Sequence, residues 1–235
     1  MSGVDVPDTA RARALLREAA SLQPAVFASS FGAEDMVLLD LIRSDDLDIL
    51  IFTLDTGRLP EETHALMQEV VERYGHCFTT HHPDAQALQS LVARIGTNGF
   101  YDSVENRKAC CAVRKVEPLA RALAGKRAWV TGLRAQQSQA RAQVVGRARD
   151  ELHELEKFNP LHDWSEQDVW AYIRAKGVPY NRLHDRFYPS IGCAPCTRAI
   201  TPGEDIRAGR WWWEQSETRE CGLHRAPQKS IREPA

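Results

Sequence analysis

Residues 25–35 read AVFASSFGAED, which is a short apolar run followed by two serines, a glycine turn and an acidic helix start. The apolar run predicts a buried strand over 25–29, and the segment that follows predicts an amphipathic helix over 33–44. A strand that leads through a tight turn into a helix is typical of α/β folds. This stretch therefore indicates the fold class of the chain.

The same alternation continues through the first half of the sequence. Further strands are predicted over 48–54, 76–80 and 128–131, and further helices over 60–74, 84–95 and 112–123. The resulting order predicts an α/β fold with a mainly parallel sheet flanked by helices. Ligands of such sheets bind outside the carboxyl ends of the strands, so we expect the site at the loops that begin at Ser29, Leu54 and Gly132.

The second half has a weaker pattern. Residues 136–150, QQSQARAQVVGRARD, show no clean period and are predicted to form a mobile loop. A strand and turn are expected over 155–164, and Ser165 is expected to cap a helix that runs to about Lys176. Prolines, glycines and aromatic residues predict irregular structure beyond it. We divide the chain into an N-terminal helical segment (1–24), a main domain (25–214) and a C-terminal tail (215–235).

Composition limits the cellular context. The chain has 235 residues, of which 43% are hydrophobic, enough for a sizeable core. No apolar run approaches the roughly 18 residues of a membrane span, and the first residues lack the features of a signal peptide. We therefore expect a cytoplasmic protein without membrane partners. Its six cysteines are then expected to serve metal binding or thiol chemistry rather than disulfides.

Positive charge is concentrated in one segment. Eleven lysines and arginines lie between Arg107 and Arg149, against Glu117 alone, although the net charge of the chain is −2. Such a block suits a polyanionic ligand. A solvated basic face or an RNA-binding surface would have the same composition.

Polar residues follow three predicted strands. Ser30, Phe31 and Gly32 form a turn whose hydroxyl and backbone N–H groups suit a phosphate. Asp55, Thr56 and Gly57 suit a ribose or nucleotide, and Arg134 offers a guanidinium to an anionic oxygen. Each motif alone also fits an ordinary turn or helix start. Neither a Walker lysine motif nor GxGxxG is present in the sequence.

Four cysteines form two close pairs, Cys110-Cys111 and Cys193-Ala194-Pro195-Cys196. Four thiols fit the ligation of a [4Fe–4S] cluster or of zinc. A vicinal disulfide, or a redox pair of Cys193 and Cys196, would account for only one of the pairs.

Cys221 stands apart from these pairs, between Arg219 and Arg225 and close to His224. Positive groups nearby favour the reactive thiolate, although an idle cysteine in a tail is the alternative. Arg207 and Arg210 are spaced to act together on a sulfate or phosphate. The tryptophans at 211–213 are predicted to serve packing.

Together these residues closely resemble the assimilatory adenylyl-sulfate reductases of the phosphoadenylyl-sulfate reductase family. The resemblance runs from about residue 25 to 224. Besides the paired cysteines, it rests on SFGAED (30–35), FTLDTGRLPEET (52–63), VTGLR (130–134), NPLHDWSEQDVWAYI (159–173), VPYNRLHDRFYPSIGCAPCTR (178–198), EDIRAGRWWWE (204–214) and ECGLH (220–224).

The resemblance implies an adenine nucleotide α-hydrolase-like fold, a reductase domain over 25–214 and a mobile tail that carries the nucleophile Cys221. His224, near the nucleophile, would be a further substrate-binding residue. It implies one [4Fe–4S] cluster on Cys110, Cys111, Cys193 and Cys196. The nucleotide would be held by Ser30, Phe31, Gly32, Asp55, Thr56 and Gly57. The phosphosulfate would contact Lys115, Arg134, Arg207 and Arg210.

The implied activity is the reduction of adenosine 5′-phosphosulfate to sulfite and AMP through a cysteine S-sulfonate. Thioredoxin would be the separate reductant, because the sequence has no fused thioredoxin-like domain. The nearest alternative is the same reaction on the 3′-phosphorylated substrate. More distant alternatives are an ATP-consuming adenylylating or thiolating enzyme and a zinc-bearing nucleic-acid-binding module. We expect no nucleic-acid partner, and the sequence leaves the oligomeric state open.

Overall fold

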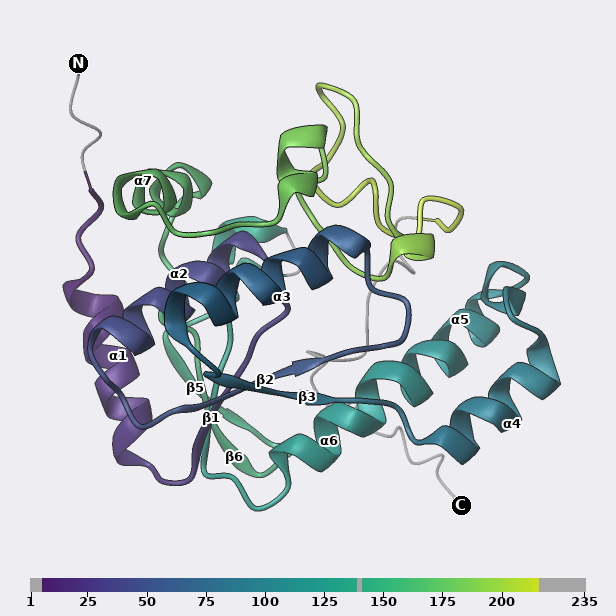
Figure 1. The fold of residues 1–235 in the computed structure, drawn as a ribbon, viewed down its shortest axis with the longest axis horizontal. Helices are drawn as coiled ribbons and strands as arrows, with labels where there is room; N and C mark the ends of the chain where they lie inside the picture. Colours follow the sequence, from purple (N-terminus) through teal and green to yellow (C-terminus); the bar gives the residue numbers. More distant parts are fainter. Residues whose placement is uncertain (1–5, 139–140, 216–235) are drawn as a thin grey trace, which may run out of the picture.

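A six-stranded sheet forms the centre of the structure, a computed structural model that describes residues 6–138 and 141–215 (Figure 1). The strands run in the order β3-β2-β1-β4-β6-β5, and every neighbouring pair is parallel except β5 with β6. They are β1 (Ala25–Ala28), β2 (Leu50–Leu54), β3 (Phe78–His81), β4 (Ala128–Val130), β5 (Arg147–Asp150) and β6 (Leu155–Phe158). The predicted α/β fold with a mainly parallel sheet is confirmed.

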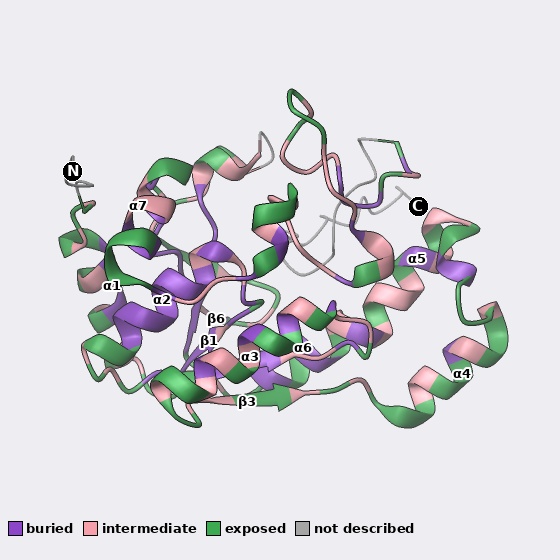
Figure 2. Cartoon of the chain, turned by 45° about the horizontal axis from the view of Figure 1, so that its top comes forward, coloured by how far each residue is buried: buried purple, intermediate pink, exposed green. Residues whose placement is uncertain are grey.

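Helices cover both faces of this sheet. The helices of the described chain are α1 (Ala10–Ser21), α2 (Ala33–Ser44), α3 (Glu61–Tyr74), α4 (Ala85–Ile95), α5 (Val104–Cys111), α6 (Glu117–Leu123) and α7 (Glu166–Lys176). Strand side chains alternate between the faces, so Phe27 belongs to the larger core with α1, α2, α3 and α7, whereas Val26 packs on the α6 side. Figure 2 shows α2 coloured mostly as buried, because α7 covers it from outside.

The strand order creates a crevice between β1 and β4. The chain leaves β1 towards β2 and β3 on one side, and returns to place β4 on the other side of β1. The loops that follow β1 and β4 therefore diverge at the carboxyl end of the sheet, which is where open parallel sheets bind ligands. This position agrees with the site expected from the sequence.

One predicted helix begins eight residues too late. The expected helix over 112–123 is preceded by α5, which runs through a π-helical turn, Ala112–Val116, into α6. The side chain of Ser103 caps α5 by accepting a hydrogen bond from the N–H of Asn106 at 3.1 Å. Because the buried residue of α5 is Arg107 rather than an apolar one, its sequence has no apolar period to detect.

The predicted mobile loop over 136–150 is also wrong in part. Its last four residues form the antiparallel edge strand β5, where Arg147 is paired with Glu156 of β6 at 2.8 Å. The strand is largely exposed and polar, so it has no alternating pattern to mark it.

The predicted start of α7 is confirmed, because Ser165 caps this helix in a reciprocal arrangement with Asp168. Helix α1 lies within residues 1–24. After Gly177 the described chain has only short 3-10 turns, Arg182–Arg186 and Ala194–Cys196. Within the described ranges, no helix is both long and apolar enough to cross a membrane. All but the first residue of the predicted tail lies outside the described residues.

Candidate active site

The loop that follows β1 is held by Asp35, in the first turn of α2. Oδ2 of Asp35 accepts hydrogen bonds from the backbone N–H of Ser30 at 2.6 Å and from its hydroxyl at 2.7 Å. Phe31 adopts a φ of 57°, and its buried ring packs edge-on against Phe78 with the centroids 5.2 Å apart. The turn leaves Gly32 at the N-terminus of α2, where the helix dipole favours an anion.

The loop after β4 packs against the same aspartate. A Cβ on Gly132 would overlap Oδ1 of Asp35 and would lie 3.1 Å from Cβ of Glu34. Burial raises the pKa of Asp35 to about 6, although its hydrogen bonds with Ser30 act in the opposite direction. The two loops are fitted together with no room for a side chain at position 132.

A cavity of about 660 Å³ opens where these loops meet. One part of its wall is apolar and is formed by Ala28, Phe52, Leu54, Leu119 and Trp129. Seven of the predicted substrate-binding residues also line it: Ser30, Gly32, Thr56, Lys115, Arg134, Arg207 and Arg210. An apolar wall with a few convergent polar and charged groups is typical of a small-molecule site.

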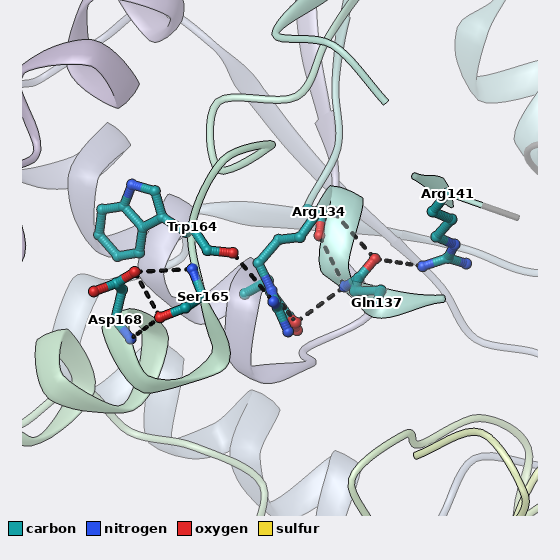
Figure 3. Close-up of polar contacts among 8 residues, drawn as sticks. Arg134, Gln137, Arg141, Trp164, Ser165 and Asp168 are labelled. Atoms are coloured by element: carbon teal, nitrogen blue, oxygen red, sulfur yellow. Dashed lines mark hydrogen bonds and ion pairs between the residues drawn. The ribbon is translucent and has the colours of Figure 1, made fainter. Parts of the chain in front are cut away.

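Arg134 enters this cavity already paired. Its Nε donates to Oε1 of Glu34 at 2.8 Å, and Nη1 donates to the backbone carbonyl of Trp164 at 3.2 Å. The side chain is only 5% exposed. Figure 3 shows Arg134 between Trp164 and Gln137, whose amide also donates to Glu34 at 3.0 Å. An anion in the cavity would therefore share Arg134 with a carboxylate.

Three predicted substrate residues lie outside the cavity wall. Phe31 is buried in the core, as its ring contact shows. Oδ1 of Asp55 accepts from the N–H of Gly57 at 2.8 Å, and Oδ2 lies 3.6 Å from Nε2 of His64. Gly57 has a φ of 67°, which favours glycine. Their place in the structure is to shape the turns that follow β1 and β2.

The four paired cysteines come together. Cys110 and Cys111 end α5, whereas Cys193 precedes the short turn Ala194–Cys196 and Cys196 ends it. All four line a second, small cavity of about 20 Å³, together with Arg114 and other basic residues. None of them forms a disulfide. Sequence positions more than 80 apart thus meet at one place.

Hydrogen bonds hold the turn between Cys193 and Cys196. The N–H of Ala194 donates to the carbonyl of Arg58 at 2.8 Å, and the hydroxyl of Tyr101 donates to the carbonyl of Pro195 at 2.7 Å. The carbonyl of Cys196 accepts from the N–H of Trp211 at 3.1 Å. Three different segments therefore fix this turn opposite α5.

Four thiols lining one cavity are, in number and kind, the donors that a metal centre uses. Desolvation raises the pKa of Cys196 to about 12, which Lys115 and Arg210 oppose, and burial also raises the pKa of Cys110. Binding of a metal would release the protons from such thiols. Over residues 6–138 and 141–215, no group of three or more cysteine, histidine, aspartate or glutamate side chains has an arrangement that could hold a metal ion. The structure thus brings the four thiols to one cavity.

The two cavities share a wall. Lys115, Arg210 and Trp211 line both of them. Lys115 lies on the π-helical turn directly after the tandem cysteines, and Arg210 bridges back to Thr197 beside the second pair. Two cations are therefore shared between the thiols and the large cavity.

Some site residues were not predicted. Glu34 lies within the SFGAED motif, but only the structure shows that it lines the cavity and pairs with Arg134. Trp211, predicted to serve packing, is buried and also lines both cavities. The sequence does contain a signal for Glu34, because this carboxylate lies in the first turn of a helix that begins at the expected ligand site. Cys221 and His224 lie outside the described residues.

The family model of the phosphoadenosine phosphosulfate reductase domain matches residues 24–199. The curated adenosine 5′-phosphosulfate reductase of Allochromatium vinosum is 60% identical over 217 residues, which is 91% of this chain and 85% of that protein.

Solved structures agree with the sequence match. The phosphoadenylyl-sulfate reductase of Candida auris, solved as a phosphate complex, superposes with a TM-score of 0.68 at 27% identity, covering 80% of this chain and 90% of that one. The FMN adenylyltransferase of Candida glabrata, with FAD and pyrophosphate, has a TM-score of 0.53 at 14% identity over 93% of this chain and 82% of that one, which shows a shared fold alone. The crevice of the parallel sheet, the gathered cysteines and these matches lead to one conclusion: the chain belongs to the phosphoadenosine phosphosulfate reductase domain family.

Proposed function

We propose that this protein reduces adenosine 5′-phosphosulfate to sulfite and AMP in assimilatory sulfate reduction. The relative from Allochromatium vinosum carries the name of this activity at 60% identity. The observation that carries the proposal is the shared wall, where Lys115 and Arg210 line both the four-cysteine cavity and the large cavity. A dianionic substrate would meet positive charge there.

The cavity suits the parts of this substrate. The apolar wall around Phe52 and Trp129 would take the adenine ring. Ser30, Gly32 and Thr56 would hold the ribose and the phosphate near the N-terminus of α2. The sulfonate end would then lie towards Lys115, Arg207 and Arg210, with Arg134 as a further contact that Glu34 partly neutralises.

Cys110, Cys111, Cys193 and Cys196 would hold a [4Fe–4S] cluster, since four clustered thiols in an electropositive site match its ligand set. When bound, the cluster would order the site and orient the charge of Lys115 towards the substrate.

Cys221 would be the nucleophile. Its thiolate attacks the sulfur of the sulfonate, the bond between this sulfur and the bridging oxygen breaks, and AMP leaves with the electron pair. Lys115 and the arginines stabilise the negative charge that develops on the bridge and the sulfonate. A thiolate of thioredoxin then attacks the sulfur of Cys221, sulfite leaves, and the second thioredoxin thiol frees Cys221 from the mixed disulfide. Two thiols are oxidised as sulfur(VI) becomes sulfur(IV).

Several parts of this mechanism stay predictions. The tail (215–235) would act as a separate unit that carries Cys221 and His224 to the cavity. Thioredoxin is the predicted reductant, and the cytoplasm is the predicted compartment.

Anaerobic purification followed by iron and sulfide analysis and a sulfite-release assay tests the proposal. We expect about four irons and four sulfides per chain, as in a [4Fe–4S] cluster, and sulfite release that requires reduced thioredoxin. The specificity constant should be larger for adenosine 5′-phosphosulfate than for its 3′-phosphorylated form. The opposite preference would favour the 3′-phosphorylated substrate. Zinc without sulfide, together with salt-sensitive nucleic-acid binding, would contradict the proposal.

A further inference from the structure

A buried ion pair ties the end of the described chain to helix α5. Nε and Nη2 of Arg107 each donate to one carboxylate oxygen of Glu214, both at 2.7 Å. The two side chains are 1% and 2% exposed. Two parallel hydrogen bonds between a guanidinium and a carboxylate fix orientation as well as distance. Since breaking a buried pair leaves one charge without compensation, neither residue can leave the other at low cost.

Arg107 connects this pair to the tandem cysteines. It lies three residues before Cys110 and four before Cys111 on α5, so it shares a helix face with them. Although burial acts to lower the pKa of Arg107, hydrogen bonds with Glu214 and with the Cys111 side chain raise it. The helix that presents two thiols therefore also holds Glu214.

Trp211 connects the pair to the second cysteine pair. Its ring centroid lies 4.9 Å from Cζ of Arg107 and 4.7 Å from Cζ of Arg210, so the indole contacts both guanidinium groups. Its backbone N–H donates to the carbonyl of Cys196, and its carbonyl accepts from the N–H of Glu214 at 2.9 Å. The turn over 211–214 thus contacts both α5, which carries Cys110 and Cys111, and the turn that carries Cys196. Figure 1 shows this last coloured segment of the chain beside α5.

We propose that the Arg107–Glu214 pair positions the root of the C-terminal tail and so sets the approach of Cys221 to the substrate. The inference rests on the proposed function, in which Cys221 is the nucleophile. Cys221 follows Glu214 by seven residues, a reach of roughly 24 Å of extended chain. A fixed root confines the thiolate to a smaller volume around the cavity, which raises its effective concentration at the sulfonate.

Substitutions in the full chain test this role. Glu214→Gln keeps the shape of the side chain but removes its charge, and Arg107→Lys keeps the charge but removes the two parallel hydrogen bonds. The control is Glu117→Gln, since Glu117 accepts two hydrogen bonds from Arg121, at 3.0 and 3.2 Å, on the exposed face of α6. The control makes the same chemical change at a surface pair of the same geometry.

The readouts separate positioning from folding. They are the single-turnover rate of the S-sulfonate adduct at saturating substrate, the KM, the affinity for AMP, the iron content and the thermal midpoint. We expect both Glu214→Gln and Arg107→Lys to lower the adduct rate per iron-loaded enzyme by about tenfold or more, with the AMP affinity unchanged. Glu117→Gln should retain the wild-type rate. Glu214→Asp, which restores the carboxylate, should recover part of the rate.

Two outcomes would overturn the inference alone. The first is an unchanged adduct rate per loaded enzyme in both variants. The second is a loss confined to the thermal midpoint and iron content, which would mark the pair as structural. A wild-type enzyme that forms no adduct would instead overturn the proposed function, and this inference with it.

Discussion

The guanidinium of Arg210 lies directly over the α-carbon of Gly192, so that a Cβ on Gly192 would be 2.5 Å from Cζ of Arg210. Nη1 of Arg210 also donates to the carbonyl of Ile191 at 3.1 Å. Because Gly192 directly precedes Cys193, the absence of a side chain there lets a cation approach the cysteine pair and the large cavity together.

Replacing Gly192 by alanine is expected to displace the Arg210 guanidinium and to lower kcat/KM by about tenfold or more. Iron content is measured in parallel to detect any effect on Cys193. In an Arg210→Ala background, Gly192→Ala should lower kcat/KM little further, because the guanidinium that it displaces has already been removed. Equal losses in both backgrounds would contradict this role of Gly192.

Asp35 should make the stability of the protein depend on pH. Burial raises its pKa from 3.8 to about 6, so the folded state binds this proton more tightly than the unfolded state does. The resulting stabilisation is complete below about pH 4 and is lost as the pH rises through 6. The Asp35→Asn variant has no titratable group at this position. As the pH rises over this range, its free energy of unfolding should therefore increase relative to that of the wild type by up to about 3 kcal/mol.

Urea unfolding of both proteins between pH 4.5 and 8 measures this difference. Groups that do not interact with Asp35 titrate alike in the two proteins and cancel. A difference in unfolding free energy that stays constant with pH would show that Asp35 is not perturbed in this way.

Removing one thiol of either pair should abolish the metal centre. We expect Cys110→Ser and Cys193→Ser to lose iron, visible absorbance and activity together, because each supplies one of four ligands. Cys77→Ser is the matched control, since Cys77 packs against the core away from the paired cysteines and should retain all three. A colourless but fully active Cys110→Ser enzyme would exclude a required cluster.

The cations of the cavity should act on turnover rather than on metal content. Lys115→Ala and Arg207→Ala are each expected to lower kcat by about 100- to 1,000-fold with full iron content, as is common when a charge-stabilising donor is removed. Arg121→Ala, which removes an exposed cation of α6, should have kcat close to wild type. Wild-type kinetics for both cavity variants would remove these residues from the site.

The sequence predicted the elements that have strong local signals. The strand of 25–29 and the helix of 33–44 carry enough apolar residues to mark their type, and the helix bounds agree with α2. Ser165 followed by Asp168 marks the start of α7. The cysteine spacing pointed to a shared site because a single metal centre can use four thiols that lie in two close pairs along the chain.

The remainder depends on tertiary contacts. Helix α5 buries Arg107, whose charge is compensated by a residue 107 positions away, so its burial cannot be read from local sequence. Strand β5 is largely exposed, has three charged residues out of four, and is held by backbone pairing with β6. The pairing of Arg134 with Glu34 likewise joins loops that only the sheet brings together. Whether a motif residue faces a cavity also depends on the tertiary fold. The motifs predicted substrate contacts for Phe31, Asp55 and Gly57, but none of these residues lines the cavity.

Intact-protein mass spectrometry can show whether Cys221 carries the sulfonate. Without thioredoxin, adenosine 5′-phosphosulfate should convert the wild-type enzyme to a species heavier by one SO₃ group, with release of one equivalent of AMP. The adduct should map to Cys221 and should be discharged as sulfite by reduced thioredoxin. Cys221→Ser should keep its iron and bind nucleotide but form no adduct, because a serine hydroxyl is a far weaker nucleophile than a thiolate. An adduct on Cys77 or on one of the paired cysteines, or sulfite release by Cys221→Ser at the wild-type rate, would contradict the mechanism.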